Sequence, residues 1–196
     1  MKTDYVSLFP KIVGKYLFDE HEKYEKDYVE KCLSLKSSID RGGKNWINQT
    51  VYNTENNYDL NGDYKFKALT TFFHNCAIDY CTKLNYSGYL KHTNSFFNIY
   101  SKGDYQDWHD HPGTSLSGIY CLSGEKGSAD IFFTDFNFDK IKFGVKEFTT
   151  DNSSIWKEEF KPGKFLLFRS DLLHCVNRHE LETNRFSIAT NFSIQH

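Results

Sequence analysis

The sequence lacks an excess of charge of either sign. Its 24 lysine and arginine residues nearly balance 26 aspartate and glutamate residues, which leaves a formal net charge of −2. Proteins that bind nucleic acid or anionic lipid through broad electrostatic attraction carry a large positive charge. We therefore expect no general nucleic-acid binding, although a local basic patch is compatible with this composition.

Long apolar segments and paired cysteines are also missing. No window of about 18 apolar residues occurs, so the sequence carries no signal for membrane insertion or secretion. The five cysteines form an odd set without a C-x-x-C pair, which argues against a zinc ribbon or a redox centre. We expect a cytoplasmic protein with reduced, mostly buried thiols and no membrane partner.

Bulky side chains, by contrast, are abundant. Aromatic residues make up 17% of the 196 residues, and a chain of this length can bury a core without disulfides. No linker, repeat or low-complexity segment divides it. We predict a single domain over residues 1–196, with helical N-terminal support in residues 1–85 and a β-rich core in residues 86–196.

Hydrophobic periodicity predicts the secondary structure. Apolar residues recur every three or four positions over residues 19–36 and 64–84, which indicates two amphipathic helices, with a short strand between them at residues 46–52. Short β-branched and aromatic runs between turn signals predict eight further strands, at residues 90–100, 105–111, 115–122, 129–133, 146–149, 154–160, 165–168 and 185–193. This count favours a mainly β fold, a jelly roll or sandwich, with the helices packed on one face.

Two histidines flank Asp110 within the β-rich half. If residues 108–111 are extended, alternation directs His109 and His111 to one face and Asp110 to the other. Paired imidazoles on a strand are typical of iron, copper and zinc sites, although two histidines leave most of the coordination sphere unspecified. Ordinary surface histidines at a polar strand end are the alternative interpretation.

Polar residues on three other predicted elements could complete such a site. His174 follows the apolar run at residues 165–168 and is a plausible third ligand. Arg185 and Ser187 share one face of the last strand, opposite an apolar face formed by Phe186, Ile188 and Phe192. If the polar face lines a cavity rather than solvent, the arginine requires an anion. Asn98 and Tyr100 share a face of their strand and could bind the same anion, or could form only a cross-strand pair.

Taken in order, these motifs form a recognisable series. It reads Asn98-x-Tyr100-x-x-Gly103, His109-x-His111-Pro112, Ser117-Gly118-Ile119-Tyr120, Gly163-x-Phe165, His174-Cys175-Val176 and Arg185-x-Ser187. The series resembles the iron(II)/2-oxoglutarate-dependent oxygenases, and especially the short oxygenases of bacteria and tailed phages, whose opening is similar to Leu8-Phe9-Pro10. The resemblance extends over nearly the whole chain and is most specific over residues 96–192.

The resemblance implies a fold and a site. The fold is a double-stranded β-helix, a jelly roll with the N-terminal helices packed on its major sheet and a metal between its two sheets. Fe(II) would be held by His109, His174 and a third protein ligand, with 2-oxoglutarate and O2 as co-substrates. Arg185 and Ser187, helped by Tyr100 and Asn98, would hold the distal carboxylate of 2-oxoglutarate. The implied reaction hydroxylates a substrate and converts 2-oxoglutarate to succinate and CO2.

Two positions depart from the family pattern. His111 stands where the usual two-histidine, one-carboxylate triad has Asp or Glu. We favour His111 as the third ligand, with Asp110 as the competing candidate if the strand is already broken at Trp108. Cys121 stands where many relatives have a tyrosine that contacts the co-substrate, and Tyr100 or Tyr105 could supply the missing hydrogen bond.

The sequence is compatible with several substrates and oligomeric states. A small molecule, a peptide or a protein would each suit the variable segment at residues 134–154, which is the candidate lid. We expect a monomer or homodimer. The excess of Asn, Lys, Tyr, Phe and Ile suggests an AT-rich genome, which is compatible with a phage origin and would place the protein in a host cytoplasm. A cupin-like metalloprotein that does not use 2-oxoglutarate and a non-catalytic binding domain are the alternatives. The remaining histidines are expected on the surface or on helix faces (His21, His74, His92, His179 and His196).

Overall fold

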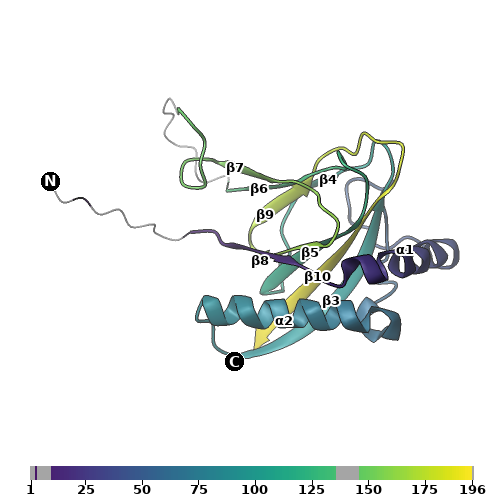
Figure 1. The fold of residues 1–196 in the computed structure, drawn as a ribbon, viewed down its shortest axis with the longest axis horizontal. Helices are drawn as coiled ribbons and strands as arrows, with labels where there is room; N and C mark the ends of the chain where they lie inside the picture. Colours follow the sequence, from purple (N-terminus) through teal and green to yellow (C-terminus); the bar gives the residue numbers. More distant parts are fainter. Residues whose placement is uncertain (1–2, 4–9, 136–145, 196) are drawn as a thin grey trace.

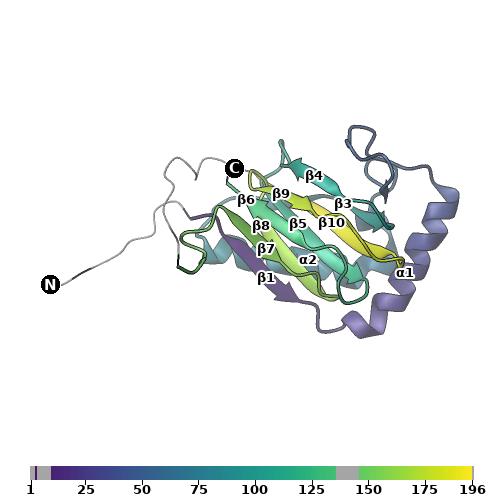
Figure 2. The ribbon, with the colours of Figure 1, turned by 90° about the horizontal axis from the view of Figure 1, so that it is seen from above.

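The computed structural model describes residue 3, residues 10–135 and residues 146–195. Within these residues the chain forms two sheets and two α-helices, α1 (His21–Ser38) and α2 (Lys67–Lys83) (Figures 1 and 2). Two 3-10 turns, Leu60–Gly62 and Tyr64–Phe66, precede α2. The strands are β1 (Val13–Leu17), β2 (Tyr52–Asn53), β3 (Tyr89–Tyr100), β4 (Gln106–His109), β5 (Leu116–Ser123), β6 (Ile131–Thr134), β7 (Ile155–Glu158), β8 (Lys164–Arg169), β9 (Leu173–Val176) and β10 (Arg185–Gln195).

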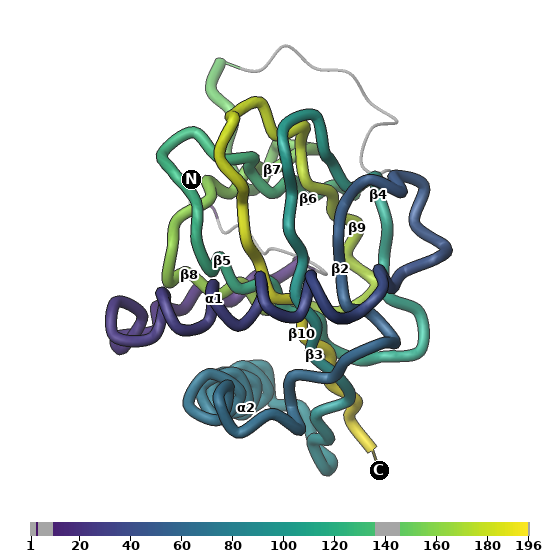
Figure 3. The backbone as a smooth tube through the Cα atoms, turned by 90° about the vertical axis from the view of Figure 1, so that its right-hand side faces the viewer, coloured from purple at the N-terminus to yellow at the C-terminus, as the bar shows by residue number. Residues whose placement is uncertain are grey.

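The strands form two antiparallel sheets that face each other (Figure 3). The larger sheet has the order β1-β8-β5-β10-β3-β2, and the smaller has the order β4-β9-β6-β7. One hydrophobic cluster fills the space between the sheets and includes Tyr100, Ile131 and Phe168. The predicted mainly β, two-sheet architecture is therefore confirmed.

The larger sheet has an outer face, on the helix side, and an inner face, toward the smaller sheet. On the outer face Phe73 of α2 stacks on Phe165 of β8 at 4.6 Å between ring centroids and meets Tyr120 of β5 at 5.6 Å. Figure 1 shows α2 lying along this face. Phe186, Ile188 and Phe192 of β10 are buried in the same cluster, as their alternation predicts.

Gly118 explains one of the sequence motifs in terms of packing. A Cβ atom at this position would lie 2.5 Å from ring carbons of Phe165 and 3.0 Å from Thr190. No side chain fits between β5 and this ring, so the Ser-Gly-Ile-Tyr run requires glycine at its second position. The absence of a side chain here leaves room for the Phe165 ring, which stacks on Phe73 of α2.

Several predicted strands were wrong. Residues 46–51 form a loop, because the Arg41 guanidinium binds the main-chain carbonyls of Asn48 and Val51, and only β2 pairs with the sheet. Residues 146–149 form no strand, since no neighbouring strand in the described residues pairs with them. The predicted strand at 105–111 ends at His109. The sequence reasoning also missed β1, which contains Gly14, and β9, which has only four residues.

Other predictions can be compared directly with the structure. The five cysteines are free, and Cys32, Cys76 and Cys121 are buried. His21 lies on a helix, as expected, with its ring buried against Tyr120, whereas His92 and His179 lie on neither a helix nor the open surface, because each is at least partly buried and hydrogen-bonded. None of the described helices is long and apolar enough to cross a membrane. The opening Leu8-Phe9-Pro10 motif, most of the candidate lid and His196 fall largely outside the described residues.

Candidate metal centre

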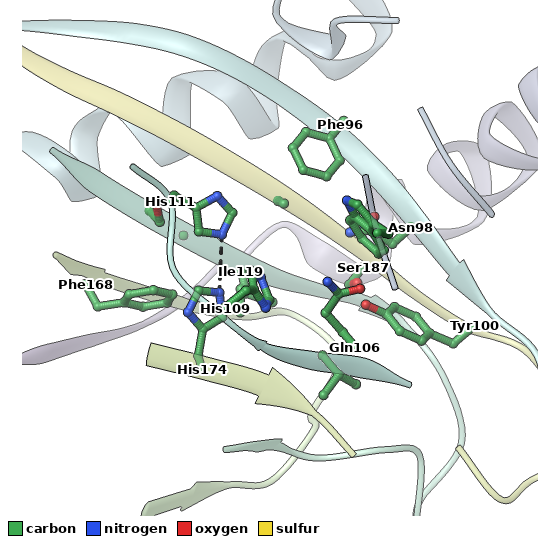
Figure 4. Close-up of a pocket in the computed structure, with 15 residues that line it drawn as sticks. Phe96, Asn98, Tyr100, Gln106, His109, His111, Ile119, Phe168, His174 and Ser187 are labelled. Carbon is green, nitrogen blue, oxygen red and sulfur yellow. Dashed lines mark hydrogen bonds between the residues drawn. The ribbon is translucent and has the colours of Figure 1, made fainter. Parts of the chain in front are cut away.

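Three histidine side chains converge between the two sheets (Figure 4). His109 ends β4 and lies directly opposite His174 of β9, with ring centroids 4.2 Å apart. His111 reaches the same position from the loop that follows β4, and its Nε2 lies 3.3 Å from Nε2 of His174. One ring nitrogen from each of the three histidines lies within 4.8 Å of the other two.

His111 lies just beyond the end of β4 and directly before a turn at residues 112–113. Its backbone N–H donates to the Ser170 carbonyl at 2.9 Å, and its own carbonyl accepts from the Thr114 hydroxyl at 3.2 Å. These bonds fix the loop against the turn between β8 and β9. Asp110 is exposed and does not belong to the cluster. The histidines are grouped and Asp110 lies outside the group, as alternation predicted, although the paired strand ends at His109.

Main-chain carbonyls set the tautomers of two of the imidazoles. Nδ1 of His109 lies 2.7 Å from the Asp107 carbonyl oxygen, and Nδ1 of His174 lies 2.9 Å from that of Leu172. A carbonyl oxygen only accepts, so in both rings Nδ1 carries the hydrogen and donates it. Nε2 of each ring therefore presents its lone pair to the centre of the cluster, as a metal ligand must.

Burial keeps the three histidines uncharged at neutral pH. Desolvation is the main cause that lowers the pKa of His109, His111 and His174, and it brings the pKa of His111 to about 4. Proximity to His109 lowers the pKa of the other two further. Because only the neutral imidazole binds a metal, this environment prepares the cluster for a cation.

Arg185 provides a buried positive charge next to this site. Its side chain is 0% exposed, and its guanidinium lies between the rings of Tyr100 and Phe160, 4.7 Å and 4.5 Å from their centroids. Nε donates to the Ala129 carbonyl at 3.0 Å and Nη1 to the Ser187 hydroxyl at 3.1 Å. Among the described residues, Nη2 has no hydrogen-bond partner and no carboxylate forms an ion pair with this arginine.

The aromatic contacts reduce the cost of burying Arg185 but leave it incompletely solvated. Desolvation lowers the pKa of Arg185, with nearby Tyr100 acting in the opposite direction, and burial raises the pKa of Tyr100 to about 12. A buried guanidinium with a free N–H is best satisfied by an anion. The inner face therefore offers both a cation site and an anion site.

The pocket at the centre brings most of the predicted residues together. Asn98, Tyr100 and Ser187 line it along with the three histidines, while Arg185 lies immediately behind Tyr100 and Ser187. Across the sheet, Tyr100 is paired with Arg185 and Asn98 with Ser187, so their side chains share the inner face. Cys121 is the neighbour of Ser187 on the other side. Tyr105 does not line the pocket, because its ring packs against Arg178 instead.

Two pocket residues were not found by sequence reasoning. Trp46 comes from the loop held by Arg41, which lies some 60 residues before the histidines and carries no motif. Gln106 was passed over because regular alternation places it on the opposite face from His109. A bulge in β4 changes that relation, and no feature of the sequence marks its position.

Comparison with known proteins gives a match over the part of the chain that contains this pocket. The sequence profile of a family described as "Putative 2OG-Fe(II) oxygenase" matches residues 94–191, which include the three histidines and Arg185. No curated protein matches the chain in sequence.

Solved structures show the same fold at low identity. A prolyl-4-hydroxylase from Pseudomonas putida is similar with a TM-score of 0.63 and 11% identity, covering 95% of this chain and 94% of that chain. A prolyl hydroxylase from Trichoplax adhaerens, solved with a hypoxia inducible factor peptide, has a TM-score of 0.64 and 14% identity, covering 92% and 84%. The epimerase SnoN, solved with Fe3+ and alpha ketoglutarate, has a TM-score of 0.66 and 11% identity, covering 94% and 79%. The two sheets thus form the jelly roll shared by these enzymes.

Proposed function

The chain belongs to the 2OG-Fe(II) oxygenase family, whose cofactors are Fe(II), 2-oxoglutarate and O2, and we propose that it hydroxylates a substrate with conversion of 2-oxoglutarate to succinate and CO2. The observation that carries this proposal is the convergence of His109, His111 and His174 beside a buried arginine with an unpaired N–H. Burying three imidazoles together, or a guanidinium without an anion, does not stabilise the fold by itself. Together they match the two ends of a keto acid bound to a metal.

The three histidines fit a divalent first-row metal. Metal–nitrogen bonds are about 2.0–2.1 Å, so two nitrogens that lie 3.3 Å apart can bind one ion. Imidazole suits iron as well as zinc and copper, although the all-histidine set lacks the carboxylate that usually balances part of the charge. Bound Fe(II) would supply the oxidising chemistry with O2, while the protein's residues hold and orient the reactants.

Arg185 would hold the distal carboxylate of 2-oxoglutarate. Its free Nη2 can donate a charge-assisted hydrogen bond, and Ser187 keeps Nη1 in position. Tyr100 and Asn98, which line the pocket between Arg185 and the histidines, would add further hydrogen bonds. The apolar walls contributed by Ile119 and Phe168 would exclude water from the reacting groups.

The remaining parts of the proposal concern the substrate and the domain. We propose that residues 1–196 act as one domain in which α1 and α2 brace the larger sheet. The solved relatives include enzymes with a peptide and with a small-molecule ligand, and either class would suit this chain. The exposed Trp108 and the pocket-lining Trp46 lie on elements around the histidines and would contact such a substrate.

The test is a calorimetric titration of 2-oxoglutarate under anaerobic conditions with Fe(II) present. Arg185→Ala should weaken 2-oxoglutarate binding by about 2–4 kcal/mol, or roughly 30- to 1,000-fold, because it removes charge-assisted hydrogen bonds. Fe(II) affinity measured without 2-oxoglutarate should change little, since the histidines are intact. Arg178→Ala, which removes an arginine outside the pocket, is the matched control.

The outcomes separate the candidate functions. Succinate formation and 2-oxoglutarate binding that depend on Arg185 support the oxygenase. Metal binding without any 2-oxoglutarate binding would instead indicate a cupin-like metalloprotein, and absence of both would indicate a non-catalytic domain. Thermal melting of each variant shows whether it is folded.

A further inference from the structure

A bulge in β4 turns Gln106 into the same pocket as His109. Gln106 pairs with Val176 and His109 pairs with His174, so three steps along β4 correspond to two steps along β9. Residues two apart on β9 share a face, and their directly opposite partners share it too. The extra residue of a bulge re-aims side chains in this way. Regular pairing would have turned Gln106 away from the histidines.

The side chain of Gln106 is buried and has no partner in the described part of the chain. Gln106 is 8% exposed, and its Oε1 accepts no hydrogen bond. No hydrogen bond from its Nε2 is present among the described residues either, although the amide lines the pocket. Asn98 is 5% exposed, and its Oδ1 likewise accepts no hydrogen bond from the described residues. Figure 4 shows both side chains directed into the pocket.

A buried amide without partners is destabilising, because it has lost its hydrogen bonds to water and gained none. Apolar side chains fill most equivalent positions between the sheets, as the cluster of Tyr100, Ile131 and Phe168 shows. An amide held there by a bulge is therefore explained best by a ligand that completes its hydrogen bonding.

We infer that Gln106 binds the keto-acid co-substrate by donating a hydrogen bond from Nε2 to one of its oxygens. This inference rests on the proposed function. At neutral pH both carboxylates and the keto group of a 2-oxo acid offer only acceptor oxygens, so the amide must act as the donor. Its place in the pocket, which it lines with the histidines and with Tyr100, lies along the expected path of the co-substrate from metal to Arg185.

Two substitutions at this one position separate a donor from an acceptor. Gln106→Leu keeps the approximate size and removes all hydrogen bonding. Gln106→Glu keeps the shape and replaces the donating amide nitrogen with a carboxylate oxygen. The measurement is an anaerobic calorimetric titration of 2-oxoglutarate with Fe(II) present. Gln106→Leu should weaken 2-oxoglutarate binding roughly 10- to 100-fold, and Gln106→Glu should weaken it more, because the new carboxylate repels those of the co-substrate. Gln195→Leu and Gln195→Glu, at the exposed end of β10, should leave it unchanged.

A second readout distinguishes a binding role from a structural one. If Gln106 is unpaired in the ligand-free protein, Gln106→Leu should melt at the same temperature as wild type or higher. A residue that merely supported the fold would show the reverse, with a lower melting temperature and unchanged 2-oxoglutarate affinity. Fe(II) affinity without 2-oxoglutarate should differ less than twofold between the variants and wild type.

Each result decides the inference. Equal 2-oxoglutarate affinity in wild type and Gln106→Leu would overturn it while leaving the proposed function in place, provided that Arg185→Ala still weakens binding. Binding by Gln106→Glu as tight as wild type would overturn the donor role. If wild type itself does not bind 2-oxoglutarate, the proposed function fails and the inference fails with it.

Discussion

The outer and inner faces of the larger sheet differ in chemistry, although the same strands form both. Along β10, Phe186, Ile188 and Phe192 enter a hydrophobic cluster with α2, while Ser187 lines the pocket and Arg185 lies behind it against Tyr100. The outer face is packed mainly through ring stacking and apolar burial. The inner face contains a charge and two amides without complete partners. Both faces contribute buried apolar contacts to stability, and the comparison leads us to propose that ligand binding is confined to the inner face.

The largest effect on stability is expected from disrupting the aromatic packing on the outer face. Phe73→Ala removes a fully buried ring that stacks on Phe165, and it should lower the free energy of unfolding by about 3–5 kcal/mol. Phe148→Ala, which removes a ring that is 72% exposed, is the control and should have almost no effect. Urea unfolding measures both. Loss of Fe(II) binding in folded Phe73→Ala protein would contradict the separation of the two faces.

The outer face also contains one polar contact that should make stability depend on pH. Nε2 of His92 lies 2.6 Å from the Thr190 hydroxyl, and burial lowers the pKa of His92 to about 4. The unfolded chain, with a histidine pKa near 6.5, binds the proton more readily. This contribution to stability is therefore complete above pH 6.5 and is lost as the pH falls toward 4, by up to about 3 kcal/mol.

The measurement is the difference in unfolding free energy between wild type and His92→Gln across pH 7.5 to 4. The metal-site histidines titrate in both proteins, so their effect cancels in this difference. The advantage of wild type should shrink steadily as the pH falls from 6.5. A constant difference over the whole range would show that His92 does not titrate in this way.

The inner face can be tested at its disputed ligand. His111→Ala should weaken Fe(II) binding at least 100-fold, or about 2.7 kcal/mol, since loss of an outer hydrogen-bonding partner alone costs 10- to 100-fold. Asp110→Ala should leave the affinity unchanged, because Asp110 is exposed and outside the cluster. Anaerobic Fe(II) titration measures both. The opposite ranking would make Asp110 the ligand.

The smallest effect is expected for an arginine that already has its anion. Arg169 forms two hydrogen bonds with Asp171, at 3.1 Å and 2.8 Å, on the exposed surface. Arg169→Ala should change stability by less than about 1 kcal/mol and should not alter 2-oxoglutarate affinity. Chemical unfolding and calorimetry test this. An effect as large as that of Arg185→Ala would mean that burial and the missing carboxylate partner do not distinguish the two arginines.

The sequence allowed the regular parts of this fold to be predicted. Alternation placed Arg185 and Phe186 on opposite faces of β10, and helical periodicity located α1 and α2 to within a few residues. These patterns repeat over many residues, so single exceptions do not hide them. The short edge strand β1 and the four-residue β9 gave no comparable signal.

The site was less accessible to this reasoning, because its irregular parts depend on tertiary contacts. His111 reaches the cluster through a loop tied to Ser170, and Gln106 reaches the pocket through a bulge set by pairing with β9. Neither contact is local in sequence. Trp46 likewise depends on Arg41, whose bonds to main-chain carbonyls shape the loop. Residue types and spacing could single out the three histidines that lie together but could not show how they are brought together.

The main-chain hydrogen bonds that orient His109 and His174 bear on how this site tolerates mutation. In each case the acceptor is the carbonyl of the residue two positions earlier, Asp107 or Leu172. Every amino acid supplies such a carbonyl, so replacing either neighbouring side chain leaves the acceptor in place. A lineage could therefore change most of the surrounding sequence by neutral drift without turning the two rings. The orientation of these imidazoles depends on the backbone geometry of the strands, which is kept when the neighbouring side chains are replaced.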